Sequence, residues 1–145
     1  MDRIKERQKL AWEGLFYSVQ RIDLLIISLC SAGIYVSLET LKYLSKNNQE
    51  NSFTLKVGGV FFLLGIIINF LSQTSGFNSN KQEYLKCLVE IDCFNTKSKE
   101  SDKKIRKYDK AAEKFSDWTN YLNTASMIFM FAGLITITSY FLITF

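Results

Sequence analysis

The chain has 145 residues, 48% of them hydrophobic, and a formal net charge of +4, which is enough sequence for one structural unit. It contains no His, which excludes Ser/His/Asp hydrolases, His-dependent nucleases and HExxH metalloenzymes. It also lacks the GxxxxGK[ST] and GxGxxG phosphate-binding motifs, so the protein is not expected to be an enzyme.

The apolar residues are segregated from the charged ones on a scale that predicts a membrane protein. They collect in three long runs, whereas the charges collect near the N-terminus and in one central block. A soluble domain would interleave the two classes with a period of about 2 or 3.6 residues. The absence of Pro permits long uninterrupted helices. The predicted fold class is therefore all-α, an integral membrane protein with three transmembrane helices and a cytoplasmic helical layer.

Residues 1–22 predict a basic, amphipathic lead-in helix. Mostly apolar residues recur there every three or four positions, on one helical face: Ile4, Gln8, Ala11, Leu15, Val19 and Ile22. The charge ahead of the first apolar run is unlike that of an ordinary cleaved signal peptide. Only Gly14 interrupts the pattern, so one helix is expected from about Arg3 to Leu44.

Three segments are apolar and long enough to cross a hydrocarbon core of about 30 Å. They are residues 23–44, 53–73 and 121–144, with an outer loop at 45–54 between the first two. The third has no charged residue, whereas Glu39 and Lys42 interrupt the first. The whole chain, 1–145, is interpreted as a single membrane unit.

The central block, residues 78–120, predicts cytoplasmic helices. A short helix is expected around Tyr84, Leu88 and Ile91, followed by a turn at Asn95–Ser98, with Ser98 or Ser101 as the cap of the next helix. That second helix is expected to continue into the third span. Its apolar stripe supplies the candidate cytoplasmic interaction residues, which are Ile105, Tyr108, Phe115 and Trp118.

The distribution of Lys and Arg predicts the topology. The central block holds ten basic residues and the N-terminal segment five, so both are expected on the cytoplasmic side. The N-terminus is then inside and the C-terminus outside. Eight acidic residues nearly balance the ten basic ones of the central block, so nucleic-acid binding is not expected.

Each predicted span has a face of small or polar residues, the kind of face through which helices associate in lipid. The candidate residues are Ser28, Ala32, Tyr35 and Glu39 in the first span, Gly58, Phe62, Gly65, Asn69 and Ser72 in the second, and Ala125, Ala132, Thr136 and Ser139 in the third. Two interpretations remain open. In the first, the faces join the three helices into one bundle. In the second, some of the faces point between protomers or line a water-filled path.

Two polar residues within these faces require partners. An ionisable group such as Glu39 is costly in lipid unless it forms an ion pair or is hydrated. Lys42, Lys46 or Lys56 is its candidate ion-pair partner, and a pore-mouth or sensing role is the alternative. Asn69 lies in the apolar part of the second span and needs a hydrogen-bond partner, which is expected on a neighbouring helix.

The three cysteines do not predict a metal or a cofactor. Cys30 lies within the first span and is expected to act as a small hydrophobic residue. Cys87 and Cys93 lie in the charged block, and without His or a CxxC motif they do not form a zinc site.

The layout from Arg3 to Phe94 comprises a basic lead-in helix, a tight two-span hairpin and a returning cytoplasmic helix. It resembles the SLATT group of small bacterial membrane effectors. The likeness is carried by Ala11–Val19 leading into Ile22–Leu25, and by Gly65–Ser72 leading on to Tyr84 and Leu85. The third span is additional to that two-span plan.

The resemblance implies an effector of bacterial antiviral defence in the inner membrane. A cytoplasmic regulatory protein or signal would hold it silent, and it would form homo-oligomers that permeabilise or depolarise the membrane. Two alternatives remain. One is a membrane anchor or accessory subunit that recruits a soluble partner through residues 78–120, and the other is a small channel or holin-like protein.

Overall fold

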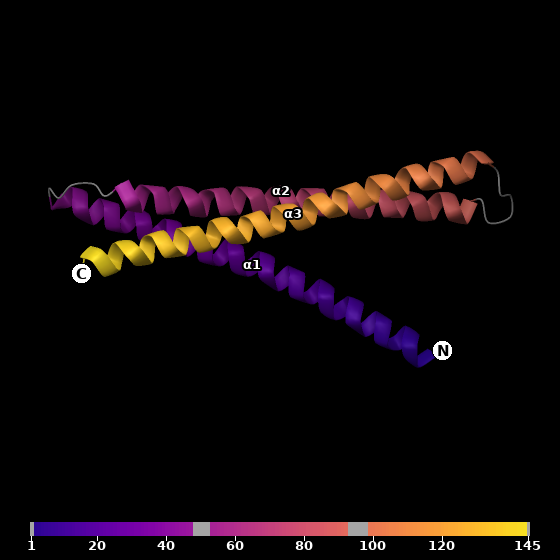
Figure 1. Cartoon of the computed structure of the whole chain (residues 1–145), viewed down its shortest axis with the longest axis horizontal. Helices are drawn as coiled ribbons and strands as arrows, with labels where there is room; N and C mark the ends of the chain where they lie inside the picture. Colours follow the sequence, from indigo (N-terminus) through magenta and orange to yellow (C-terminus); the bar gives the residue numbers. More distant parts are fainter. Residues whose placement is uncertain (1, 48–52, 93–98, 145) are drawn as a thin grey trace. The chain divides into compact units, whose positions relative to one another are not determined.

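The structure is a computed structural model that describes the backbone of residues 2–47, 53–92 and 99–144, and the surroundings of the side chains in 20–47, 53–91 and 99–144. Three helices account for these residues: α1 (Asp2–Lys46), α2 (Phe53–Asp92) and α3 (Lys99–Thr144), of 45, 40 and 46 residues (Figure 1). The all-α prediction is confirmed for this part of the chain. All three helices are long and apolar enough to cross a membrane, as the sequence predicted.

The helices are continuous over the segments where the sequence predicted continuity. α1 runs through Gly14 to Lys46, and α3 runs from the central block to Thr144. A single Gly inside a helix costs about 1 kcal/mol relative to Ala, which is too little to break a helix of this length.

Two local predictions for the central block were wrong. Tyr84, Leu88 and Ile91 do not form a separate short helix, because α2 continues through Gly76 to Asp92 without a breaker. Ser101 lies inside the first turn of α3, which begins at Lys99, so it is not the capping residue. Ser98 and the turn expected at 95–98 lie outside the described residues, as does most of the outer loop.

The chain forms two compact units. The first comprises Met1–Ile66 and Met127–Phe145, which means α1, the start of α2 and the end of α3. Its buried core contains one or two side chains from each helix: Ile26 and Cys30 of α1, Phe62 of α2, and Met130 and Ile137 of α3. Ile34, Ile66, Met127, Leu134 and Phe141 pack around this core.

Glycines bring the three helices of the first unit close together. The Phe62 side chain is fully buried, and its ring lies against Gly33 of α1 and Gly133 of α3. Ile137 of α3 packs in the same way against Gly58 of α2. Close approach over small residues is a common packing mode between membrane helices.

The second unit, Ile67–Ser126, is an antiparallel hairpin of α2 and α3 (Figure 1). Three serine hydroxyls of α2, spaced three and four residues apart, donate hydrogen bonds to main-chain carbonyls of α3. The bonds join Ser72 to Thr119, Ser75 to Phe115 and Ser79 to Ala112, over 3.0, 3.0 and 2.9 Å. We call this set the serine ladder.

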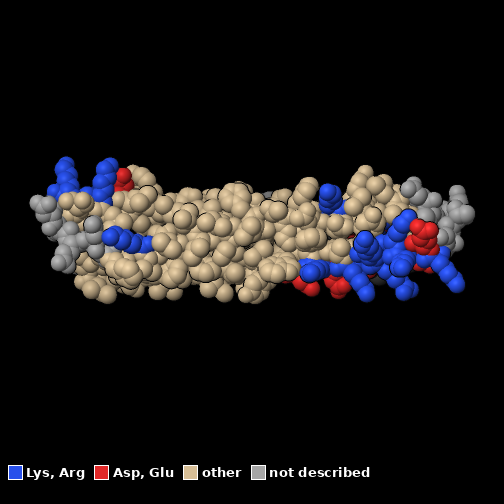
Figure 2. All heavy atoms as spheres, turned by 90° about the horizontal axis from the view of Figure 1, so that it is seen from above, with Lys and Arg blue, Asp and Glu red and all other residues tan. Residues whose placement is uncertain are grey.

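Charged side chains are gathered in groups on the molecular surface. On the face drawn in Figure 2, a broad surface shows no Lys, Arg, Asp or Glu. This agrees with the sequence, in which residues 57–80 and 118–145 contain no charged residue. The segregation expected from the sequence is therefore also present on the surface.

Candidate functional site

The predicted face of α1 does not pack inside the chain. Ser28, Ala32, Tyr35 and Glu39 are all exposed, and Tyr35 is 67% exposed. At about 100° per residue they lie on the side of α1 roughly opposite the buried Ile26. The interpretation that this face joins the three helices of one chain is therefore wrong for α1. The residues that do pack are Ile26, Cys30, Gly33, Ser37 and Leu44.

We call the exposed side of α1 the α1 stripe, defined by Ser28, Ala32, Tyr35, Glu39 and Lys42. Its two charged residues form an ion pair with 3.6 Å between Lys42 Nζ and Glu39 Oε1. The predicted partnership of Glu39 with Lys42 is thus confirmed. The two side chains remain 50% and 78% exposed, so the pair is solvated on one side and contributes little to stability.

The predicted face of α2 is buried. Gly58, Phe62 and Gly65 are buried in the first unit. In the second unit Asn69 is fully buried, and its Oδ1 accepts a hydrogen bond from Gln73 Nε2 over 2.9 Å. This partner lies one turn along the same helix, and a partner of Asn69 on a neighbouring helix stays a prediction.

A hydrogen bond between α2 and α3 involves a residue that the sequence analysis missed. The Ser72 hydroxyl shares its proton between the Thr119 carbonyl and Asn123 Oδ1, which lies 2.6 Å away. Asn123 stands in the charge-free part of α3, as Asn69 stands in that of α2. A polar amide in such a run is the signal that would have identified it.

The predicted face of α3 is rotated relative to the buried one. Ala132 and Thr136 are half-buried and Ser139 is exposed, whereas Met130, Gly133 and Ile137 face the core. The buried positions 133 and 137 each follow a predicted position by one residue, which is a rotation of about 100°. The Thr136 hydroxyl donates to the carbonyl of Ala132 over 2.7 Å, within its own helix.

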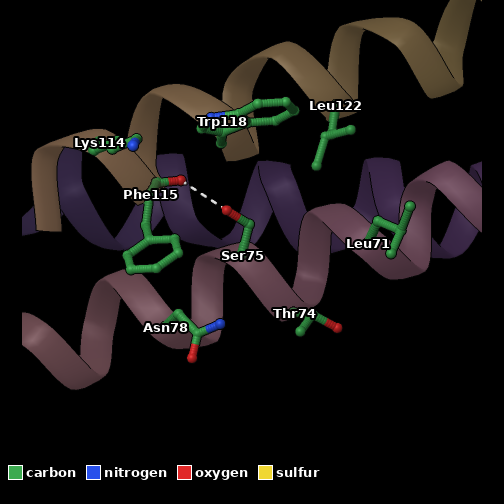
Figure 3. A pocket seen from close by; sticks show the side chains of 8 residues that line it. All are labelled: Leu71, Thr74, Ser75, Asn78, Lys114, Phe115, Trp118 and Leu122. Atoms are coloured by element: carbon green, nitrogen blue, oxygen red, sulfur yellow. Dashed lines mark hydrogen bonds between the residues drawn. The ribbon is translucent and has the colours of Figure 1, made fainter. Parts of the chain in front are cut away.

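Ile105, Tyr108 and Phe115 of the predicted cytoplasmic stripe are half-buried, and Trp118 is 52% exposed. Phe115 and Trp118 line a cleft of about 500 Å³ between α2 and α3 in the second unit (Figure 3). Lys114 and Leu122 of α3 complete one wall, and α2 supplies the other with Leu71, Thr74, Ser75 and Asn78. We call this the Trp118 cleft.

The Trp118 cleft is polar at one end and apolar at the other. Figure 3 shows Lys114 and Asn78 at the end where Phe115 lies, and Leu71 and Leu122 at the opposite end. The Ser75 hydroxyl is engaged across the cleft with the carbonyl of Phe115. The arrangement suits an amphiphilic molecule, because one end offers a cation and an amide and the other offers only hydrocarbon.

The hairpin of the second unit is also held by a charged group. Lys86 Nζ lies 2.7 Å from Asp109 Oδ1 and 3.3 Å from Glu83 Oε1. Hydrogen bonds to Asp109 and then to Glu83 raise the pKa of Lys86 above its ordinary value. Lys86 therefore joins α2 to α3 as a permanent cation at any physiological pH.

Among the residues whose side chains the structure describes, no group of three or more His, Cys, Asp or Glu is placed to hold a metal ion. Comparison with protein-family models, with curated proteins and with solved structures found no match to this chain.

Proposed function

We propose that the chain spans a membrane three times, with its N-terminus in the cytoplasm and its C-terminus outside. The observation that supports insertion is the exposure of large apolar side chains on every helix of the first unit. Those more than half exposed include Leu24, Leu25, Val60, Ile128, Phe131, Ile135 and Leu142. In water a continuous surface of this kind promotes aggregation, whereas acyl chains solvate it.

The helices are longer than a bilayer requires. A span needs about 20 residues, and the three helices contain 45, 40 and 46. The charged parts of α2 and α3 therefore extend into the cytoplasm, in the orientation that the excess of Lys and Arg favours.

In this membrane the protein assembles as a homo-oligomer through the α1 stripe. Ser28, Ala32 and Tyr35 face away from the core of their own chain, and Glu39 and Lys42 continue the same side. Small and polar residues are a poor surface toward lipid but a good one toward another helix. Because the stripe carries one charge of each sign, it is complementary to a parallel copy of itself.

The assembled copies permeabilise the inner membrane during bacterial antiviral defence, as the resemblance to the SLATT group implies. The α1 stripe is the single observation that carries this function, since it offers a polar surface that the protomer leaves uncovered. Side chains such as Ser28 and Glu39 would line or border the conducting path. A cytoplasmic signal acting on the second unit would release the effector.

The test substitutes Trp on two helices of the first unit. Ala32→Trp places a bulky ring in the α1 stripe, and Ile135→Trp places the same ring at an exposed apolar position of α3. The wild type is expected to form an oligomer in detergent and, when triggered or overexpressed, to depolarise cells and admit an impermeant dye. Ala32→Trp is expected to abolish both properties, and Ile135→Trp to retain them. A monomeric wild type, or an Ala32→Trp protein that still assembles and depolarises, would contradict the proposal.

A second candidate function is recruitment of a soluble partner by a membrane-anchored accessory subunit. It is favoured by apolar side chains that the second unit exposes among charged ones, namely Tyr84 and Ile91, which are 64% and 70% exposed. In that case affinity purification captures one partner in stoichiometric amount through residues 78–120. Ala32→Trp then leaves recruitment intact, which separates this function from the first.

A further inference from the structure

The Trp118 cleft lies where both of its helices change from charged to uncharged sequence. On α3 the last charged residue is Asp117, and on α2 the first after the charge-free run is Lys81. Trp118 and Tyr121 are exposed there and contact each other edge to face, with ring centroids 6.3 Å apart. Trp and Tyr favour the boundary between hydrocarbon and head groups, so this level of the hairpin corresponds to a membrane surface.

Along α2 and α3, the lining of the cleft changes from apolar to polar in the same direction as the sequences of the two helices do. Leu71 and Leu122 lie toward the apolar segments of α2 and α3, and Asn78 and Lys114 lie toward the charged block (Figure 3). A phospholipid at the cytoplasmic surface has the same order, with its acyl chains toward the bilayer centre and its phosphate at the head-group level. The volume of about 500 Å³ falls within the range of about 300–1,000 Å³ typical of small-molecule sites.

Lys114 is available to an anion. Two other lysines of the second unit are paired, Lys86 with Asp109 and Glu83, and Lys104 with Glu100. Among the described residues Lys114 has no carboxylate within ion-pair distance, and it is the cationic member of the cleft. The ammonium group supplies the charge for a phosphate, and Asn78, on the facing helix at the same end of the cleft, supplies an amide hydrogen-bond donor.

We propose that the Trp118 cleft is a binding site for an anionic phospholipid of the cytoplasmic leaflet. Lys114 and Asn78 hold the phosphodiester, and an acyl chain lies along Phe115 and Trp118 toward Leu71 and Leu122. The inference rests on the proposed membrane insertion, but not on oligomerisation or on permeabilisation. It gives the hairpin a fixed depth in the membrane.

Trp118 itself reports on the occupant. The chain has two tryptophans, so Trp12→Phe leaves Trp118 as the sole indole fluorophore. The protein in this background is reconstituted into nanodiscs of phosphatidylcholine containing a small fraction of lipid brominated on its acyl chains. The brominated lipid is phosphatidylglycerol in one series and phosphatidylcholine in the other. Bromine quenches an indole on contact, so the mole fraction at half-quenching measures the occupancy of the cleft.

Brominated phosphatidylglycerol is expected to quench Trp118 at a mole fraction about fivefold lower than brominated phosphatidylcholine, the preference that one basic group near an anionic lipid provides. Lys114→Gln is expected to remove the preference. Lys107→Gln, which removes the same charge two turns away on the same side of α3, is expected to keep it.

Three results would overturn the site. They are equal quenching by the two lipids, an equal loss of preference in Lys107→Gln and Lys114→Gln, and no quenching by either lipid. If the protein nevertheless resists extraction by alkaline carbonate, the proposed membrane insertion stands without the cleft. A protein that carbonate extracts would overturn both together.

Discussion

The ring of Phe62 occupies the space into which a side chain at Gly133 would project. A Cβ atom at that position would lie 2.9 Å from Cδ1 and from Cε1 of the ring. Gly33 stands in the same relation to another edge of the ring. One aromatic side chain of α2 is therefore held between glycines of α1 and α3, and the packing of all three helices depends on the absence of two methyl groups.

Adding either methyl group is expected to destabilise the protein. Gly33→Ala and Gly133→Ala each force the buried Phe62 ring to move, and overpacking of this kind costs about 1–3 kcal/mol. Gly59→Ala is the matched control, because the nearest atom to its Cβ would be Ser37 Cβ at an ordinary 3.6 Å. Thermal denaturation in detergent should show lower midpoints for the first two variants and an unchanged or higher one for the third.

A compensating change tests the geometry of this contact. Phe62→Leu shortens the side chain and should recover part of the stability that Gly133→Ala loses, because residues in contact have non-additive effects. If the double variant is as unstable as the sum of the two single ones, Phe62 and Gly133 are not in contact.

Removal of the serine ladder is expected to destabilise the hairpin by small amounts that add up. Ser75→Ala and Ser79→Ala each delete one hydrogen bond between α2 and α3, and Ser72→Ala deletes a hydroxyl shared between two acceptors of α3. Such a hydrogen bond between membrane helices is worth about 0.6 kcal/mol on average. The triple variant should therefore lose about 2 kcal/mol in a denaturant titration. Thr124→Ala is the control, since that exposed hydroxyl bonds only to the carbonyl of Asn120 on its own helix.

Reversal of the ion pair between α2 and α3 should separate the contribution of charge attraction to stability from that of side-chain packing. Lys86→Asp or Asp109→Lys alone places like charges side by side and is expected to lower the melting temperature. The double reversal should restore most of it. Lys104→Gln serves as the control, because its pair with Glu100 is exposed and lies within one helix. No recovery in the double reversal would show that Lys86 and Asp109 are not paired.

The same pair has a defined dependence on pH. The pKa of Lys86 is raised in the folded protein above its ordinary value of 10.5, so the folded state binds the proton more tightly. The stabilisation from Lys86 is therefore complete below that value and is lost only as the pH rises through the higher pKa of the folded protein. The difference in stability between wild type and Lys86→Met should stay constant from about pH 7 to pH 9.

Charge reversal in the α1 stripe tests the proposed association of parallel copies. Glu39→Lys places two cations on each copy and should weaken the oligomer. The double variant Glu39→Lys with Lys42→Glu keeps one charge of each sign, so its copies remain complementary to one another. Particle mass in detergent, measured at low and high salt, should show recovery in the double variant. A mass that responds to neither change would remove the stripe from the interface.

The sequence predicted the helices better than it predicted which faces pack. An apolar run of more than 20 residues without Pro leaves little choice other than a helix, and α1 and α3 have the continuity that was expected. On α2 the face was also correct, because Gly58, Gly65 and Asn69 are conspicuous in an otherwise apolar run and share one side of the helix.

On α1 two sides have a similar composition, and sequence alone could not choose between them. The stripe of Ser28, Ala32 and Tyr35 has the heptad spacing of a packing face, but so do Cys30, Gly33 and Ser37. The choice depends on a distant residue, since only the ring of Phe62 requires a glycine opposite it. On α3 the predicted and buried faces differ by one residue, which a helical periodicity of small residues does not resolve.

The serine ladder has a consequence for the alignment of the two helices. Its acceptors are main-chain carbonyls, which every residue of α3 carries, so the ladder holds the two helices together without itself selecting one register of α3 along α2. Side-chain contacts select the register, among them Lys86 with Asp109, Ser72 with Asn123, and Phe62 with Gly133. Adhesion and alignment of the two helices are therefore encoded by different residues, and a substitution can weaken one without changing the other.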